Sequence, residues 1–572
     1  MYNIADLLEI EGENPFKVNA YRRAAENISN LGRSLRDVWQ EGELESIPGI
    51  GQALAKKLDE LLRTGRLEMY ERLQERVPPD LLEVLRVPGI GPRRARQFWQ
   101  ELDITNLQAL KEVAEAGRLR RLPGMGVRSE QRILEGIAAL ERQRSGRIPL
   151  GVAHPLALQL LDALREAVPG MARAEVAGSV RRWRETIGDL DLLVAAPETD
   201  APRIMDAFVR LPQVTSVLLT GPTKTSVRLK AGTYELQADL RVLPPARWGT
   251  ALQYFTGSKA HNIELRERAL KMGYSLSEHA LAPVEGEPER LFDNEEALYA
   301  ALGLTWIPPE LREAAGEIEA AEAGTLPRLL ELADIQGELH AHTTWSDGRL
   351  SVAEMADAAR SRGYRYFAIT EHSQGLGVTG GMNVEQLRAQ RGEIEAYNRL
   401  TGDAFRLLHG IEVEVRADGT LDYPNDVLAE LDVVVAGLHS GLRQDRQKIT
   451  QRVLTALRNP HVDILAHPSG RLLGEREASQ VDMDLVLRTA AETGTILEIN
   501  AHPARLDLDA PHIRRACELG VKLVVNCDAH SAEELDYLIY GVGTARRGWA
   551  TPVNVVNTWP LEQLLAYLSE RE

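Results

Sequence analysis

The chain has 572 residues, which corresponds to about four domains. Its composition is 44% hydrophobic, 26% charged and 5% aromatic, as in ordinary globular proteins, and this excludes disorder or a fibrous repeat along the whole chain. The net charge of −17 is unevenly spread, because residues 1–280 carry +3, residues 281–572 carry −20, and ten of the thirteen histidines lie at or after His340. We therefore expect phosphate contact in the first half and metal binding in the second.

Membrane and export segments are not indicated. The longest runs without Asp, Glu, Lys or Arg have 14 residues, at 148–161 and 548–561, and are too short to cross a bilayer. Residues 1–12 lack the basic and apolar regions of a signal peptide. Only Cys517 and Cys527 are present, which excludes a disulfide framework. We therefore expect a cytoplasmic protein without membrane contact.

One short turn pattern occurs three times in the first half. The copies are Ile47-Pro48-Gly49-Ile50-Gly51, Val87-Pro88-Gly89-Ile90-Gly91 and Leu122-Pro123-Gly124-Met125-Gly126. Each precedes a segment with helical apolar spacing, so its backbone N–H groups can face an anion where that helix begins. A single copy is more often a plain corner, but three copies stand among six arginines: Arg93, Arg94, Arg96, Arg120, Arg121 and Arg128. The turns resemble helix-hairpin-helix motifs, which implies that Gly49, Gly51, Gly89, Gly91, Gly124 and Gly126 contact DNA phosphates.

After about residue 150 the sequence becomes mixed α/β, and acidic residues lie on predicted strands. Residues 188–194 alternate as a strand, so Asp189 and Asp191 share one face. Asp239 lies in a second alternating segment, 237–242. Neighbouring carboxylates repel unless a cation lies between them, and Mg²⁺ or Mn²⁺ prefers such oxygen ligands. A lone D-x-D is a weak signal on its own.

A glycine, a hydroxyl and two guanidiniums precede this strand in Gly178-Ser179-Val180-Arg181-Arg182. These groups can bind a triphosphate through hydrogen bonds. Together with the three aspartates they form the pattern of nucleotidyltransferases, in which two metal ions assist an in-line phosphoryl displacement.

The stretch Tyr254-Phe255-Thr256-Gly257-Ser258-Lys259-Ala260-His261-Asn262 makes the comparison more specific. With this stretch, residues 1–316 resemble family X DNA polymerases, the small repair polymerases related to polymerase beta. The resemblance also includes the segment Ala20–Ala25 of the first helical domain. The resemblance implies that Asp189 and Asp191 bind both metal ions and that Asp239 lowers the pKa of the primer 3′-hydroxyl. It places nucleotide-binding residues at Gly178, Ser179, Arg182, Gly188, Tyr254, Phe255, Gly257, Asn262 and Arg266.

Within this set the resemblance implies a division of roles. The triphosphate would be held by Ser179, Arg182 and Gly188. The sugar would lie by Tyr254 and Phe255, and the new base pair and template by Asn262 and Arg266. Gln237 replaces an arginine common in relatives, and Lys259 replaces an acidic residue, which puts fidelity and nucleotide affinity in doubt rather than activity.

The first helical domain of such enzymes can carry a lyase with a Schiff-base lysine. Lys57 aligns with that nucleophile, and Lys56 beside it would favour the neutral amine. Ala53, however, replaces a supporting lysine of the relatives. A solvated lysine or a phosphate contact is the alternative reading of Lys57.

The second half combines apolar strand-like runs with histidines and carboxylates at or just after their ends. This is the logic of a (β/α) barrel, in which functional residues follow the strands. Nine residues form the predicted ligand set: His340, His342, Asp347, His372, Glu412, His439, His467, Asp528 and His530. Imidazoles and carboxylates without thiolates suit Mn²⁺, Zn²⁺ or Fe²⁺.

The set resembles a PHP (polymerase and histidinol phosphatase) domain, a distorted seven-stranded barrel with up to three metal ions. The resemblance groups His340, His342, Glu412 and Asp528 on one metal; His439 and His467 on a second, bridged by Glu412; and Asp347, His372 and His530 on a third. Glu371 stands where an Asp is common, and His502 is a candidate substrate contact. Hydrolysis of a phosphodiester is the expected chemistry.

We therefore expect two helical DNA-binding domains (1–82 and 83–148), a nucleotidyltransferase palm (149–243), a thumb (244–316), a helical linker (317–335) and a PHP barrel (336–572). The predicted function is gap filling from dNTPs on primer-template DNA in base excision repair. The barrel would add a Mn²⁺-dependent 3′→5′ exonuclease, with AP endonuclease or 3′-phosphatase activity as extensions. We expect a monomer associated with the nucleoid. The alternatives are a template-independent transferase, a DNA-tethered phosphatase or nuclease, and a scaffold without activity.

Overall fold

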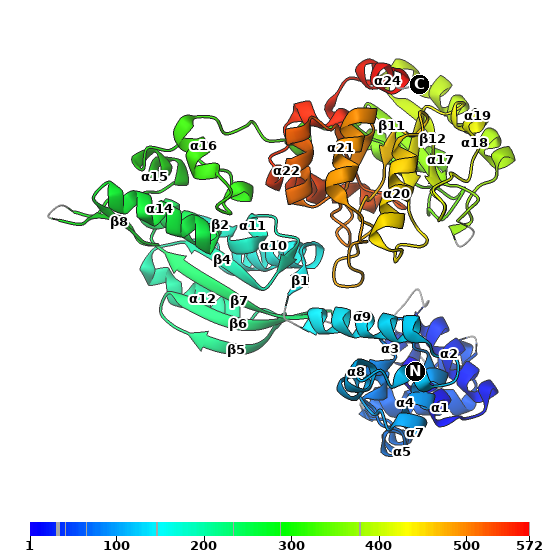
Figure 1. The fold of residues 1–572 in the computed structure, drawn as a ribbon. Helices are drawn as coiled ribbons and strands as arrows, with labels where there is room; N and C mark the ends of the chain where they lie inside the picture. The colour runs from blue at the N-terminus through cyan, green and yellow to red at the C-terminus, as the bar shows by residue number, and fades with distance from the viewer. Residues whose placement is uncertain are drawn as a thin grey trace. The chain divides into compact units, whose positions relative to one another are not determined.

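The computed structural model describes residues 1–29, 35–40, 42–47, 49–64, 66–144, 147–232, 234–285, 288–376 and 379–570. The chain forms two compact units, Met1–Ser145 and Gly146–Glu572 (Figure 1). The first is helical, and the second contains a five-stranded sheet, a small helical region and a seven-stranded barrel.

The first unit consists of short helices around one apolar core. The helices are α1 (Tyr2–Glu11), α2 (Pro15–Ser29), α3 (Leu35–Gln40), α4 (Gln52–Thr64), α5 (Glu68–Arg76), α6 (Leu81–Val84), α7 (Pro92–Leu102), α8 (Leu107–Glu115) and α9 (Val127–Arg144). The three predicted turns precede α4, α7 and α9. Their first glycines, Gly49, Gly89 and Gly124, have φ of 78°, 83° and 75°, which a side chain would disfavour. Pro48 of the first turn lies outside the described residues.

The five-stranded sheet has the strand order β2-β4-β7-β6-β5. Its strands are β2 (Arg173–Val176), β4 (Asp189–Ala195), β5 (Val214–Thr220), β6 (Lys224–Ala231) and β7 (Tyr234–Leu243). Only β4 and β7 run parallel, and the other pairs are antiparallel. A two-stranded ladder joins β1 (Ile148–Pro149) to β3 (Thr186–Ile187). Three helices contact the sheet: α10 (Leu150–Ala167), α11 (Gly178–Arg181) and α12 (Ala201–Val209).

A small helical region follows the sheet. It contains α13 (Trp248–Thr256), α14 (Lys259–Lys271), β8 (Tyr274–Leu276), β9 (Leu281–Pro283), α15 (Glu295–Ala301) and α16 (Glu317–Ala323). The sequence predicts a helical linker over 317–335, but α16 occupies only Glu317–Ala323 of it, since Gly316 and Gly324 flank this helix at φ of 93° and 66°. Glu317 is also fully buried and lies 2.6 Å from Nδ1 of His261, so this segment is packed against the fold.

Seven parallel strands in sequence order form the barrel. They are β10 (Gly337–Glu338), β11 (Tyr366–His372), β12 (Arg406–Glu414), β13 (Val433–Gly437), β14 (Ile464–Leu465), β15 (Ile496–Asn500) and β16 (Leu523–Asn526). Beyond β10 and β16, a parallel bridge between Ala341 and Ala529 brings the first strand beside the last. The predicted (β/α)₇ barrel is therefore confirmed.

Helices surround the barrel strands. They are α17 (Val352–Ser361), α18 (Val384–Thr401), α19 (Asn425–Leu428), α20 (Arg446–Leu457), α21 (Met483–Thr493), α22 (Ala510–Leu519), α23 (Leu538–Arg547) and α24 (Leu561–Ser569). Figure 1 shows α20, α21 and α22 side by side along the outside of the barrel. Among the helices that the structure describes, none combines the length and apolarity needed to span a bilayer.

Candidate metal centres

The first centre is formed by three aspartates on two neighbouring parallel strands. Asp191 on β4 lies opposite Asp239 on β7, and Asp189 lies opposite Gln237. Burial raises the pKa of Asp191 to about 7, and the charges of Asp189 and Asp239 add to this shift. The carboxylates thus destabilise one another unless a cation lies among them, which suits a divalent metal.

Two side chains hold Asp239 in its ionised form. Nζ of Lys224, on β6, lies 2.7 Å from Oδ2, and Nε2 of Gln237 donates to Oδ1 at 2.8 Å. Burial acts to raise the pKa of Asp239, but these hydrogen bonds lower it below its ordinary value. Sequence reasoning missed Lys224, because its proximity depends on the antiparallel β6–β7 register, which pairs Lys224 with Arg241.

Residues Gly178–Arg181 of the Gly-Ser-x-Arg-Arg segment form α11, and the segment approaches the aspartates directly. Gly178 has φ of 60°, and a Cβ there would lie 2.4 Å from Oδ2 of Asp191, so glycine is required. The Arg182 guanidinium donates to Oε1 of Glu313 at 3.0 Å and to the carbonyl of Thr256 at 2.7 Å. The structure thus places Gly178 against the Asp191 carboxylate. It fixes the Arg182 side chain by hydrogen bonds to Thr256 and Glu313.

A bidentate ion pair anchors the neighbouring arginine. Arg181 donates to both carboxylate oxygens of Glu295, at 2.9 and 3.0 Å. Glu295 is also bound by the fully buried Arg312. Burial acts to raise the pKa of Glu295, but Arg312 and Arg181 lower it to about 2. Sequence reasoning missed this network, because Arg181 and Glu295 are more than 100 residues apart in the sequence.

The remaining predicted nucleotide residues lie where α13 meets α14. The rings of Tyr254 and Phe255 contact each other edge to face, with centroids 5.1 Å apart. Asn262 donates to the carbonyl of Tyr254 at 2.7 Å and accepts from Gln253 at 2.8 Å. Arg266 donates to the carbonyl of Asn262 at 3.2 Å.

Two glycines of the predicted set have close neighbours. A Cβ at Gly257 would lie 2.4 Å from Oδ1 of Asn262, which explains the glycine between α13 and α14. A Cβ at Gly188, immediately before β4, would lie 3.2 Å from Nη1 of Arg147. Ser179 lies on α11 and is half-buried.

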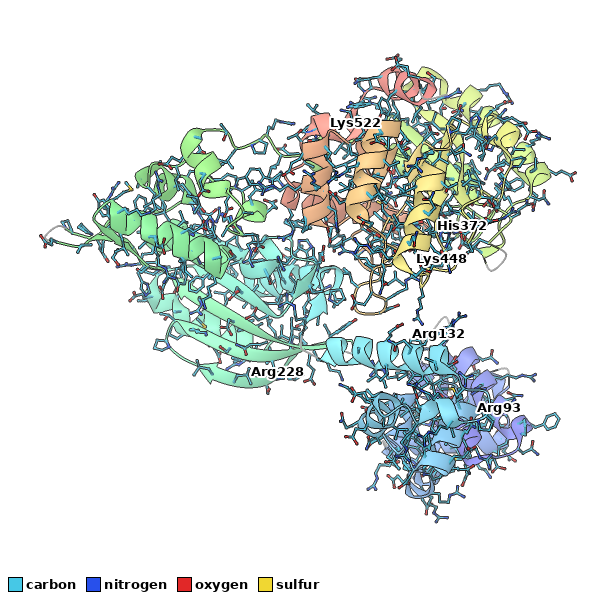
Figure 2. The ribbon with its side chains drawn as sticks, in the orientation of Figure 1. Arg93, Arg132, Arg228, His372, Lys448 and Lys522 are labelled. Atoms are coloured by element: carbon cyan, nitrogen blue, oxygen red, sulfur yellow. The ribbon has the colours of Figure 1, made fainter. Side chains whose placement is uncertain are left out.

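In the first unit, the candidate lyase lysine is hydrogen-bonded to a tyrosine. Nζ of Lys57 donates to the hydroxyl of Tyr21 at 2.6 Å. Among the hairpin arginines, Arg120 is paired with the buried Glu130 at 2.6 Å. Arg93, labelled in Figure 2, has its Nε 3.7 Å from Oε1 of Glu9, but its side chain is 92% exposed, so a phosphate can reach the guanidinium from solvent.

The second centre lies in the barrel, around the fully buried Glu412 of β12. One of its oxygens, Oε1, is 3.1 Å from Nε2 of both His439 and His467. The other, Oε2, is 2.7 Å from Nδ1 of His372 and 3.5 Å from Nε2 of His340. Burial acts to raise the pKa of Glu412, but the surrounding histidines lower it well below its ordinary range.

Asp528 completes the inner part of this centre. Its Oδ1 lies 3.1 Å from Nε2 of His342 and 3.5 Å from Nε2 of His340. Burial acts to lower the pKa of His340, but Glu498, Asp528 and Glu412 raise it well above its ordinary value. Burial lowers the pKa of His342 to about 3, and His372 adds to this effect.

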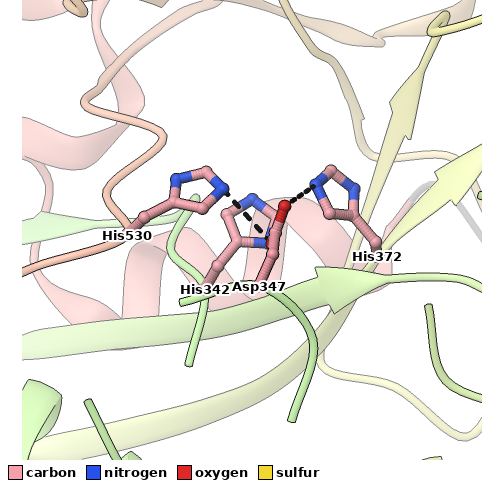
Figure 3. Close-up of side chains that lie close together, drawn as sticks. All are labelled: His342, Asp347, His372 and His530. Atoms are coloured by element: carbon pink, nitrogen blue, oxygen red, sulfur yellow. Dashed lines mark ion pairs between the residues drawn. The ribbon is translucent and has the colours of Figure 1, made fainter. Parts of the chain in front are cut away.

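Asp347 lies close to His342, His372 and His530, and these four residues form an outer group of ligands (Figure 3). Its carboxylate lies 3.3 Å from Nε2 of His530 and 3.6 Å from Nε2 of His372. Nδ1 of His342 is 4.0 Å away. The rings of His342 and His530 stack, with centroids 4.4 Å apart. All nine predicted barrel residues therefore converge on one end of the barrel.

Two carboxylates outside the predicted set orient the histidines. Glu498 lies 2.7 Å from Nδ1 of His340, and Glu414 lies 2.8 Å from Nδ1 of His439, which turns both Nε2 atoms toward Glu412. Such carboxylate–histidine pairs are characteristic of metal sites. A signal was present in the sequence, because each is a buried acid in an apolar strand, β15 and β12.

The residues present fit divalent metal ions. Among the described residues, Nε2 of His340, Nδ1 of His372 and Oε2 of Glu412 are buried and make no hydrogen bond. Nδ1 of His372 lies 2.7 Å from Oε2 of Glu412, but the geometry is not that of a hydrogen bond. Buried polar atoms normally have partners, and a shared cation would satisfy these. In the part of the chain that the structure describes, three groups of residues each have their ligand atoms within 4.8 Å of one another. The groups are His342, Asp347, His372 and His530; His340, His342 and Glu412; and His372, Glu412 and His439.

The other residues singled out in the barrel have different surroundings. Glu371 accepts hydrogen bonds from the backbone N–H of Thr343, at 3.1 Å, and from Ser346, so it braces the loop that carries Asp347. His502 contacts the ring of Tyr537, with centroids 5.3 Å apart. Arg505, absent from the sequence prediction, lies 3.6 Å from Oδ2 of Asp528 and brings positive charge to the centre.

Comparison with family models assigns four segments of the chain. A helix-hairpin-helix domain matches residues 1–67, and a SAM-like helix-hairpin-helix tandem matches residues 81–139. The DNA polymerase beta thumb matches residues 251–313, and the PHP domain matches residues 338–502. The predicted helical, mixed α/β and barrel classes are therefore confirmed.

Some relatives match the whole chain and others match 41% of it. The chain is 40% identical over 570 residues to the DNA polymerase/3′-5′ exonuclease PolX of Bacillus subtilis (strain 168), covering 100% of this chain and 98% of that protein. A probable phosphatase of Thermoanaerobacter sp. (strain X514) is 26% identical over 247 residues, 41% of this chain and 95% of its own length. A probable phosphatase of Shewanella sediminis (strain HAW-EB3) is 29% identical over 245 residues, 41% of this chain and 94% of its own length.

Proposed function

Since this chain belongs to the family X DNA polymerases that carry a carboxyl-terminal PHP domain, we propose that it extends DNA primers from dNTPs and shortens DNA 3′ ends. The two activities have separate centres, with extension at the aspartates of β4 and β7 and 3′→5′ exonuclease activity at the barrel histidines. Short gaps in duplex DNA are the substrate class, as in base excision repair. Such an enzyme acts on chromosomal DNA, so we place it in the cytoplasm with the nucleoid.

One observation carries the polymerase assignment, namely the alignment of Asp189, Asp191 and Asp239 on two parallel strands. We assign them to two ions, Mg²⁺ or Mn²⁺. When bound, such ions neutralise charge on the transferred phosphoryl group. Asp239 stays ionised at neutral pH because Lys224 and Gln237 lower its pKa. We assign the triphosphate to Ser179 on α11 and to Arg182, the residue that follows this helix.

The nuclease assignment rests on the nine-residue barrel set. We assign it up to three ions, Mn²⁺, Zn²⁺ or Fe²⁺, which supply Lewis acidity toward a phosphodiester when bound. Glu498 and Glu414 hold His340 and His439 with Nε2 directed inward. The guanidinium of Arg505 lies beside Asp528 and attracts the anionic DNA strand.

DNA is held by the helical domains through the three glycine turns. Because phosphate contacts do not read bases, these domains would bind a duplex of any sequence. We also retain Lys57 as a candidate lyase nucleophile, since its amine donates to Tyr21 and, among the described residues, is not paired with an acid.

A gapped duplex with a labelled primer tests the two-centre assignment. We expect Asp189→Ala to abolish extension with dNTPs while primer shortening in Mn²⁺ continues. We expect His342→Ala to abolish shortening while extension continues. Asp206→Ala and His512→Ala are matched controls, since both residues are at least one-third exposed at the side chain and belong to neither centre.

Two outcomes would contradict this proposal. Extension that survives Asp189→Ala would show that the three aspartates are not the polymerase centre. Shortening that survives His342→Ala would show that the barrel is not the nuclease. Extension without a template strand would instead favour the template-independent transferase.

The barrel relatives favour a second candidate activity, the removal of 3′-phosphates from DNA. Probable phosphatases match 41% of this chain, a share close to that of the barrel, and the PHP domain matches residues 338–502. A phosphomonoester would meet the same histidines and Arg505 as a phosphodiester. We expect gapped DNA to compete with a small chromogenic phosphate ester, because one centre would serve both.

A further inference from the structure

The barrel helix α23 contacts the turn that carries Arg182, a proposed triphosphate ligand. Nη1 of Arg547, at the end of α23, donates to the main-chain carbonyl of Arg182 at 2.7 Å. The same nitrogen donates to Oε1 of Glu313 at 3.1 Å. The side chain of Arg547 is only 9% exposed, so the contact is shielded from solvent. Charge-assisted hydrogen bonds of this kind are the stronger ones in proteins.

Glu313 links Arg547 to the Arg182 side chain as well. Its Oε1 accepts from Nε of Arg182 at 3.0 Å, while Nη1 of Arg182 donates to the carbonyl of Thr256. Two of the five N–H donors of this guanidinium are therefore fixed by the protein, which leaves others for a phosphate. Arg547 thus holds Arg182 at its backbone and, through Glu313, at its side chain.

The residue after Arg182 is also anchored on the barrel. Trp183 adopts φ of 55°, which is unusual for a bulky residue. Its ring forms a cluster with those of His154 and Tyr540, with centroid distances of 4.9 and 6.0 Å from the indole and 5.9 Å between the other two rings. A Cβ at Gly543 of α23 would lie 2.6 Å from the Trp183 ring, so the helix backbone and the indole are in direct contact.

A further ion pair fixes the end of this turn. Nη2 of Arg471, from the barrel, donates to Oε1 of Glu185 at 2.8 Å. The segment from Arg182 to Glu185 is therefore bound to the barrel at its backbone, at one aromatic ring and at one carboxylate.

We propose that Arg547 is a positioning residue for nucleotide binding by the polymerase centre, which makes α23 of the barrel part of the device that orients the triphosphate ligand Arg182. This inference rests on the proposed role of Arg182. A long side chain that is held in place before binding loses less entropy on binding, so the affinity for its ligand increases. The barrel would then serve polymerisation independently of its own metal centre.

The test compares three variants in steady-state gap filling with varied dNTP. Arg547→Met keeps the apolar stem but removes both hydrogen bonds, and we expect the KM for dNTP to rise about five- to tenfold, as loss of a charge-assisted hydrogen bond suggests. We expect kcat to change less than KM. Arg547→Lys retains one cationic donor and should restore part of the affinity.

Arg514→Met is the matched control. Arg514 also reaches from the barrel to the polymerase half, where it donates to the carbonyl of Ala315 at 2.6 Å, but it does not contact α11 or Trp183. We expect its KM for dNTP to equal that of the unaltered protein. Primer shortening should be the same in all of these variants, which shows that the barrel is folded.

Equal KM values for Arg547→Met and the unaltered protein would overturn the inference. A matching rise in Arg514→Met would also overturn it, because the effect would then belong to interdomain contact in general. A loss of primer shortening in Arg547→Met together with failure of Arg547→Lys to restore affinity would assign Arg547 a merely structural role. Failure of the proposed function is separate, since the unaltered protein would then not extend primers at all.

Discussion

Asp191 on β4 lies directly opposite Asp239 on β7, in a register shared by two parallel strands. The pKa of Asp191 is raised to about 7 because burial and the two neighbouring aspartates oppose its ionisation. The protein thus holds these carboxylates in a mutually repulsive arrangement that a divalent cation relieves.

Replacing Asp191 with asparagine should separate this repulsion from catalysis. We expect extension to fall at least about 100-fold, since even groups that only orient a metal ligand contribute about 10–100-fold. In EDTA the variant should melt no lower than the unaltered protein, and Mg²⁺ should no longer raise its melting temperature. Primer-extension rates and thermal melting with and without Mg²⁺ measure both effects. A Mg²⁺ shift that persists in Asp191→Asn would argue against a metal site here.

Glu412→Gln should disable the barrel without affecting extension. Glu412 lies within 3.1 Å of His372, His439 and His467, so its neutralisation removes the charge that these ligands share with a cation. We expect bound Mn²⁺ or Zn²⁺, measured by elemental analysis, to drop, and primer shortening to be lost. Glu430→Gln, at a side chain 36% exposed on the same barrel, is the control and should retain its metal.

Glu295 should make the stability of the polymerase half depend on pH. Its pKa is held at about 2 by Arg312 and Arg181, below the ordinary 4.5, so its stabilisation is full above about pH 5 and is lost as the pH falls toward 2. Glu295→Gln leaves Arg312 buried without a counter-charge, and we expect a cost of about 3–5 kcal/mol at pH 7.

Thermal melting of both proteins at pH 7 and near pH 3 measures the effect of Glu295. The difference between them should shrink at the lower pH. Glu289→Gln, at a side chain 46% exposed, should melt like the unaltered protein at both values. A difference that is independent of pH would mean that the charge of Glu295 does not stabilise the fold.

Arg93→Ala should weaken DNA binding without changing its sequence preference. Arg93 is exposed next to the second glycine turn, so we expect one phosphate contact to be lost and the slope of log affinity against log salt to decrease by about 0.9. Fluorescence anisotropy with a labelled gapped duplex at several salt concentrations measures this. Lys522→Ala, just before β16 at the barrel end away from the histidines, should leave the slope unchanged.

Gly543→Ala should disturb nucleotide binding from a distance. The added methyl group would lie 2.6 Å from the Trp183 ring, so the residue after Arg182 must move. Alanine favours a helix by about 1 kcal/mol over glycine, so α23 itself is not weakened. We expect a higher KM for dNTP with primer shortening retained. Gly392→Ala in α18, where a Cβ meets nothing within 4 Å, should change neither value.

Local patterns in the sequence predicted much of the architecture. Alternation over residues 188–194 predicted the strand that the structure shows as β4, Asp189–Ala195. The three glycine turns and the strand–helix alternation after Gly337 predicted the helical unit and the barrel in the same way. These signals are readable because each depends on neighbours within one strand or one turn.

Contacts between distant segments were not predictable in this way. Lys224 meets Asp239 through the register of a hairpin, and Glu498 meets His340 across 158 residues. Arg547 reaches Arg182 across 365 residues. Each of these partners is an ordinary charged residue in its own segment, and only the folded chain brings it to the site.

The barrel also completes the apolar core of the five-stranded sheet, since Leu506 and Tyr540 are buried among the residues of that core. This arrangement constrains how the chain can evolve. Substitutions could remove the barrel histidines one after another without exposing this core, whereas deletion of the barrel would uncover it in a single step. Exonuclease activity can therefore be lost by point mutation with this core intact, whereas loss of the domain would also disrupt the core.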